Sequence, residues 1–191
     1  MNGTGNMESP DDEQVEEAVA AVESLLGRGW REQYDRMLRW FERLHEQGEI
    51  DERRRDDFYA FFLICFHLKD WLKNDPAVQQ SLPDIDKTVE AFINGKPALR
   101  LCADLANGVK HLARDKPNTV RFADDALLSV APSAFQTDAF DAGSFQVSGE
   151  IVAKAAGQRW DAEMVASSCV AHWQNFLRSE RLLPDDATRP P

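Results

Sequence analysis

The sequence predicts a mainly α-helical bundle of four to five long helices, with a small β-rich insertion before the last helix. Apolar residues recur at spacings of three and four over most of the chain, which is typical of helices that bury one face. Residues 118–160 break this period and set single apolar residues among Gly, Ser, Pro and Asp, which is typical of short strands. The length of 191 residues and the 43% share of apolar residues fit one domain with its own core.

We expect the domain to occupy residues 11–183, between a disordered N-terminus over 1–10 and a disordered tail over 184–191, because both ends are polar and lack apolar periodicity. Ser9 and Pro10, followed by three acidic residues, are typical of a helix start. This first helix should end at the Gly27 and Gly29 pair.

The next two helices should form the centre of the bundle. The second begins near Trp30 and ends at Gly48, with an aromatic-rich stripe made of Trp30, Tyr34, Met37, Phe41 and Leu44. The third, Glu52–Lys73, has almost no polar face, so we expect it to be buried on most sides. The Asn-Asp-Pro sequence at 74–76 should terminate it.

Further helices are expected over Asp84–Ile93 and Pro97–Ala113. The apolar stripe of the longer one comprises Ala98, Cys102, Leu105, Val109 and Leu112. Within the β-rich insertion, Ala156–Gln158 is the best candidate for a tight hairpin turn, because it contains Gly157. Asp161 should then cap the final helix.

Composition and charge limit the classes of function. No apolar run reaches the 18 or more residues of a membrane span, and the N-terminus is acidic, so we expect a cytoplasmic protein that does not contact membranes. Cys65, Cys102 and Cys169 are far apart and lack metal-ligand spacing, which favours separate buried thiols and no metal. We expect no cofactor, because common nucleotide, phosphate and zinc motifs are missing from the sequence.

The formal net charge is −11, which argues against loose electrostatic attachment to nucleic acid. The charge is uneven, however. Residues 55–116 contain nine acidic and nine basic side chains, so the excess of negative charge lies in the two ends. An anionic ligand would therefore have to bind through local placement of cations in the middle of the chain.

The Pro97–Ala113 helix contains the most coherent polar face of the sequence. Its members follow one another at spacings of four and three: Arg100, Asp104, Asn107, His111 and Arg114. One interpretation is a solvated face with an Arg100–Asp104 ion pair. The other is a site in which His111 transfers protons, Asn107 orients it, and Lys110 or Arg114 stabilises an anion.

His67 could face the same site, with Lys69 and Asp70 beside it. The competing interpretation, a hydrogen-bonded core histidine, is the better supported for His67 alone. His172 is expected to be structural, and His45 lies on a charged helix.

Two segments, FFLICFHLKDWLKND at 61–75 and LCADLANGVKHL at 101–112, resemble the HEPN superfamily, and the similarity spans roughly residues 55–115. HEPN proteins are helical bundles common in prokaryotic toxin–antitoxin and antiphage defence systems. Active members are metal-independent endoribonucleases, usually dimers, with an Arg, often a polar residue after it, and a His four to six residues after the Arg. Here Asn107 and His111 match, whereas Ala106 stands at the Arg position.

The resemblance implies a HEPN-like module of a defence or toxin–antitoxin system that acts by binding or assembly, as a homodimer or with a partner protein. The missing arginine removes a bidentate phosphate donor, which disfavours catalysis. A metal-independent endoribonuclease that uses His111, Asn107 and Lys110 is the alternative. A helical scaffold unrelated to RNA is the third possibility.

Overall fold

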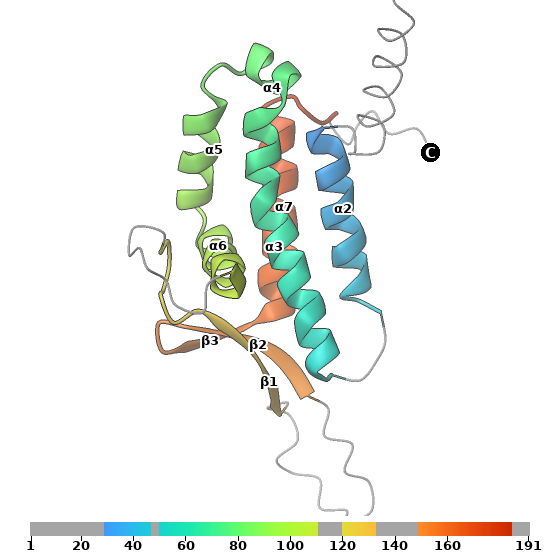
Figure 1. Ribbon diagram of the computed structural model, residues 1–191, viewed down its shortest axis with the longest axis vertical. Coiled ribbons are helices and arrows are strands. Elements are labelled where there is room, and N and C mark those ends of the chain that lie inside the picture. Colours follow the sequence, from blue (N-terminus) through green and yellow to red (C-terminus); the bar gives the residue numbers. More distant parts are fainter. Residues whose placement is uncertain (1–28, 47–49, 111–119, 133–148, 185–191) are drawn as a thin grey trace, which may run out of the picture.

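The computed structural model of the chain describes residues 29–46, 50–110, 120–132 and 149–184, and its helices pack side by side above a small sheet (Figure 1). The helices of this part are α2 (Trp30–Arg43), α3 (Glu52–Asn74), α4 (Pro76–Ser81), α5 (Ile85–Asn94), α6 (Pro97–Lys110) and α7 (Ala162–Ser179). The strands are β1 (Leu127–Pro132), β2 (Gly149–Ala155) and β3 (Gln158–Asp161). The predicted mainly helical class with a β-rich insertion before the last helix is confirmed. The expected helix before Gly27 lies outside the described residues.

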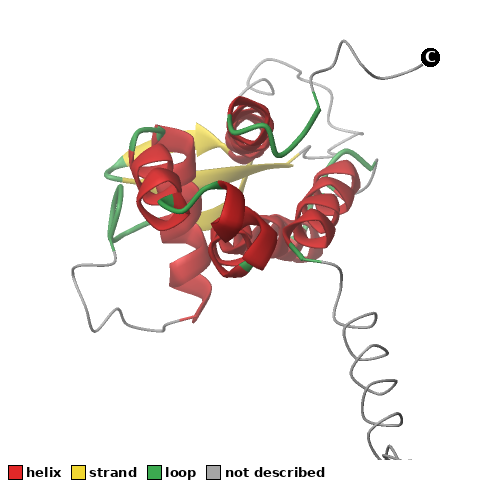
Figure 2. Cartoon of the chain, turned by 90° about the horizontal axis from the view of Figure 1, so that it is seen from above, coloured by secondary structure: helices red, strands yellow, loops and turns green. Residues whose placement is uncertain are grey.

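Helix α3 forms the centre of the bundle, as its apolar sequence predicts. In Figure 1 it runs in front of α7, with α2 on one side and α5 and α6 on the other, and Figure 2 shows the same grouping from above. Phe61, Phe62, Leu68 and Leu72 are completely buried between these neighbours. The hydroxyl oxygen of Tyr59 accepts a hydrogen bond of 2.8 Å from the Leu128 backbone N–H, which ties α3 to β1.

The three strands form an antiparallel sheet in the order β1-β2-β3. The β2–β3 turn lies at Ala156 and Gly157, as predicted, and both have positive φ angles of 52° and 70°. This backbone matches the right-handed twist of a hairpin and favours Gly or Asn. In Figure 1 the sheet lies across one end of the helices, where β3 leads directly into α7.

Aspartate side chains cap the N-termini of three helices, α3, α4 and α7. Asp51 and Asp161 each accept a hydrogen bond from the backbone N–H three residues later, and the predicted cap at Asp161 is confirmed. Asp75 accepts from the N–H groups of Ala77 and Val78 and so starts α4, a helix that the sequence did not predict. The Asn-Asp-Pro break therefore ends one helix and begins another, because Pro76 fits the first position of α4.

In the part of the chain that the structure describes, none of the helices has the length and apolar character needed to cross a membrane.

Candidate functional site

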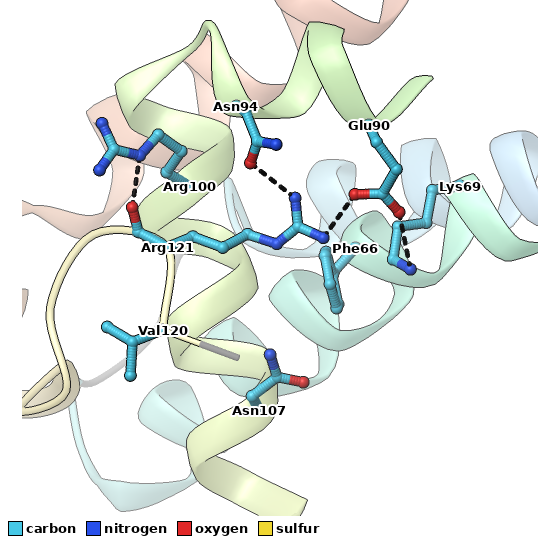
Figure 3. A pocket seen from close by; sticks show the side chains of 8 residues that line it. All are labelled: Phe66, Lys69, Glu90, Asn94, Arg100, Asn107, Val120 and Arg121. Carbon is cyan, nitrogen blue, oxygen red and sulfur yellow. Dashed lines mark hydrogen bonds and ion pairs between the residues drawn. The ribbon is translucent and has the colours of Figure 1, made fainter. Parts of the chain in front are cut away.

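A cavity of about 660 Å³ opens between α3, α5, α6 and the segment that precedes β1 (Figure 3). It is lined by Phe66 and Lys69 of α3, Glu90 and Asn94 of α5, Arg100 and Asn107 of α6, and Val120 and Arg121 of that segment. Three of these side chains are cationic and one is a carboxylate. The local charge is thus opposite in sign to the net charge of the chain.

The carboxylate of Asp104 fixes the segment that closes the cavity. Asp104 is completely buried and accepts hydrogen bonds of 2.5 to 2.9 Å from the backbone N–H groups of Arg121, Phe122 and Ala123. Arg100 supports the same segment, because its Nε donates to the Arg121 carbonyl oxygen. The interpretation of this helix face as solvated, with an Arg100–Asp104 ion pair, is therefore wrong for Asp104, because the 121–123 segment covers its carboxylate.

The guanidinium of Arg121 points across the cavity toward α5, as Figure 3 shows. It donates hydrogen bonds of 2.9 Å to Oδ1 of Asn94 and 2.6 Å to Oε2 of Glu90. The other carboxylate oxygen of Glu90 lies 2.5 Å from Nζ of Lys73 and 3.5 Å from Nζ of Lys69. One carboxylate thus holds three cationic side chains in a cluster.

The cations also determine the ionisation of Glu90. Burial raises the pKa of this carboxyl, but hydrogen bonds from Lys73 and Arg121 and the charges of Arg121 and Lys69 lower it, and the resulting pKa is about 2. Glu90 therefore stays ionised at neutral pH and keeps the cluster in place.

Phe66 provides the apolar wall of the cavity. Lys69 Nζ lies 4.8 Å and the Arg121 guanidinium carbon 5.5 Å from the centre of its ring. Both distances are within the range of cation–π attraction. The Phe66 ring is buried, with 8% of its surface exposed, so it positions the two cations at the cavity wall, where they can accept an anion.

Asp70 connects Lys69 of the cavity wall to His67. It accepts hydrogen bonds of 2.9 Å from Lys69 Nζ and 2.8 Å from His67 Nδ1. Burial raises the pKa of Asp70, but these hydrogen bonds and charges lower it. His67 is partly buried and hydrogen-bonded, and it is not part of the described cavity lining.

The structure brings together some of the residues that the sequence singled out and leaves others apart. Arg100, Asn107 and Lys69 line the cavity, while Asp104 and Asp70 do not line it but hydrogen-bond to Arg121 and Lys69 of its wall. For Lys110 only the helical backbone is described, and the positions of His111 and Arg114 lie outside the described residues.

Sequence reasoning missed Phe66, Glu90, Asn94 and Arg121 as members of the site. Glu90 and Asn94 are one turn apart on α5, a spacing that places them on one face of that helix. Arg121 follows no helical pattern, and long-range bonds to Asp104, Arg100 and Glu90 bring it to the cavity. No periodicity could have predicted those contacts.

A second cavity, of about 420 Å³, lies between α6, β3 and α7 and has a different character. Leu101, Phe122, Trp160 and Val165 make much of its wall apolar. His172 lines it as well, and burial, with a smaller effect of the Lys96 charge, lowers the pKa of this histidine. This wall suits an anion less well than the first cavity does.

Searches of protein-family models, curated proteins and solved structures found no match to the chain.

Proposed function

We propose that the protein is a HEPN-like binding module that holds a phosphate-bearing segment of single-stranded RNA in the first cavity without cleaving it. The observation that carries this proposal is the convergence of Lys69, Arg100 and Arg121 around one cavity in a chain of net charge −11. Glu90 and Asp70 offset part of the mutual repulsion of these cations, and a bound anion relieves the rest.

The other lining groups fit the remaining parts of a nucleotide. Arg100 donates from Nε to the Arg121 carbonyl oxygen, and its terminal nitrogens form no ion pair with the described residues. Those nitrogens suit a phosphate. The amide of Asn107 offers both a donor and an acceptor to a base edge.

The environment of Ala106 supports binding without ordinary catalysis. This residue stands where the HEPN resemblance implies the arginine, and it is completely buried in the helical core. An arginine at this position would have to enter the core rather than the cavity. The lining arginines come instead from positions 100 and 121, which the motif does not include.

Binding can be tested by fluorescence anisotropy with the full chain and a labelled single-stranded RNA of mixed sequence, in EDTA. We expect Lys69→Gln and Arg100→Gln each to weaken binding about fivefold to tenfold, the effect of about 1 kcal/mol from one charged contact. Matched controls are Lys154→Gln on β2 and Arg39→Gln on α2, both exposed. Equal affinity of the wild type and the two cavity variants for the RNA would contradict the proposal. Absence of RNA binding by the folded wild type would also contradict it, and this is the outcome expected of a helical scaffold unrelated to RNA.

One observation favours the endoribonuclease as a second candidate. Asn107, the residue that the HEPN motif places before His111, lines the cavity. The test is incubation of the protein with total RNA and tRNA in EDTA, beside His111→Ala. Cleavage that survives EDTA and disappears in the variant would establish the enzyme and overturn the noncatalytic proposal.

The resemblance also predicts a homodimer or a complex with a partner protein in a defence or toxin–antitoxin system. Sedimentation equilibrium of the full chain tests the first of these. A dimer mass is the expected result, and a monomer mass at every protein concentration measured would contradict it.

A further inference from the structure

The three cysteines of the chain meet at one point in the core. Cys65 comes from α3, Cys102 from α6 and Cys169 from α7, and their Sγ atoms all lie within 4.8 Å of one another. All three side chains are completely buried. The sequence predicted separate thiols, because spacing along the chain does not show which helix faces will meet.

A meeting of all three cysteines is not expected by chance. A buried residue contacts about 6 to 12 others, which are only part of the core, so three cysteines at unrelated positions would seldom all be neighbours. No other Cys, His, Asp or Glu of the described residues joins the group. The contacts that fix the thiols are backbone carbonyls, since Cys102 Sγ donates to Phe62 O at 3.4 Å and Cys169 Sγ to Ala98 O at 3.5 Å.

The indole of Trp173 supplies a second, independent observation. This side chain is completely buried, and its Nε1 has no hydrogen-bond acceptor in the described part of the chain. It lies beside the Cys65 side chain, at the point where the three thiols meet. A donor in this position is suited to sulfur that carries negative charge.

We propose that Cys65, Cys102 and Cys169 form a three-sulfur site for a trivalent thiophilic ion of the arsenite type. Sulfur bonds to such ions are about 2.3 Å long, and at the roughly 100° bond angles of a pyramidal trivalent ion the three sulfurs are separated by about 3.5 Å, so the cluster needs to contract by up to about 1.3 Å. Thiolates are the ligands that soft ions prefer.

The net charge of the bound complex favours a trivalent ion. Each sulfur must lose its proton to bind, and a monovalent or divalent ion with three thiolates would leave net negative charge in the core, at a large desolvation cost. Arsenous acid avoids this cost. One As(OH)₃ exchanges its three hydroxyl groups for three thiolates and releases three water molecules, which take up the thiol protons, so both reactants and products are neutral and no oxidant or reductant is required.

The test is native mass spectrometry of the reduced full chain, incubated to equilibrium with sodium arsenite and, in separate samples, with Cu(I) and Cd(II). We expect one arsenic per chain, with loss of three hydrogens. Cys65→Ser, Cys102→Ser and Cys169→Ser should each weaken binding at least tenfold. The control is Ala103→Ser, which places a hydroxyl at a buried position of α6 without removing a thiol. This variant should bind arsenic as the wild type does.

X-ray absorption at the arsenic edge gives a readout that does not depend on whether the serine variants fold. We expect three sulfur neighbours and no oxygen neighbour around arsenic in the wild type. Failure of the folded, reduced wild type to retain arsenic would overturn the proposal, as would oxygen ligands. Retention of Cu(I) or Cd(II) in preference to arsenite would overturn the choice of a trivalent ion.

Discussion

Asp104 shows how one buried carboxylate can organise a site without touching a ligand. The sequence grouped it with Arg100 on a polar face, either solvated or functional. In the structure it is completely buried and accepts from three consecutive backbone N–H groups. Asp104 is therefore a support for Arg121, the residue that reaches furthest across the cavity.

We predict that Asp104→Ala lowers the free energy of unfolding by about 3 kcal/mol, because it leaves buried N–H groups without an acceptor. Asp104→Asn keeps one carbonyl oxygen as an acceptor, so it should lower the free energy of unfolding by a smaller amount. Urea denaturation followed by circular dichroism measures both. The control is Asp84→Ala, an exposed position whose side chain caps no N–H group, with an expected change below about 0.5 kcal/mol. An equal loss at both positions would be inconsistent with this role.

Glu90 gives the cavity a dependence on pH. Its pKa is about 2 in the folded protein and 4.5 without the fold, so the carboxylate stabilises the fold above about pH 4.5 and this contribution is lost as the pH falls toward 2. We predict that Glu90→Gln is less stable than the wild type at pH 7 and that the difference shrinks between pH 4.5 and 2. Urea midpoints of both proteins across this range test it, with Asp86→Asn on the same helix as control. A difference that does not change with pH would refute the assignment.

At the scale of elements, the hairpin between β2 and β3 carries residual strain at one position. Ala156 has φ of 52°, where a residue with a Cβ is disfavoured, whereas Gly157 at 70° is suited to it. We predict that Ala156→Asn raises the free energy of unfolding by about 0.5 kcal/mol and that Gly157→Ala lowers it by about 1 kcal/mol. No atom lies within 4 Å of a Cβ added at Gly157, so this cost is conformational rather than steric. Thermal unfolding measures both changes, and a stabilising Gly157→Ala would contradict the turn geometry.

Elements were predictable where local chemistry specifies them. The apolar character of α3, the Asp161 cap and the turn at Gly157 follow from short-range rules, and all three are found in the structure. Helix α4 was missed because Asp75 and Pro76 can end one helix and start the next. Of the site, the sequence predicted Arg100 and Asn107, which share one face of α6, and Lys69 of α3. Arg121 and the meeting of the cysteines were not predictable, since they depend on contacts between distant segments.

At the scale of the whole molecule, the excess of negative charge limits how nucleic acid could bind. A net charge of −11 repels a polyanion at long range, and the first cavity places three cationic side chains around one opening. We predict that duplex DNA binds at least tenfold more weakly than single-stranded RNA of equal length, because a stiff duplex cannot bend a phosphate into the cavity as a flexible single strand can. Anisotropy titrations under identical salt measure the ratio, and equal affinities would indicate binding through a surface other than the cavity.

The most direct test of the cationic cavity is the salt dependence of RNA binding by the wild type, Lys69→Gln and Arg100→Gln. For single strands, the slope of log affinity against log salt changes by about 0.7 for each phosphate contact. We predict that each cavity variant reduces the magnitude of the slope by about this amount, while Lys154→Gln leaves it unchanged. A slope that is the same in all four proteins would show that these cations do not contact phosphate.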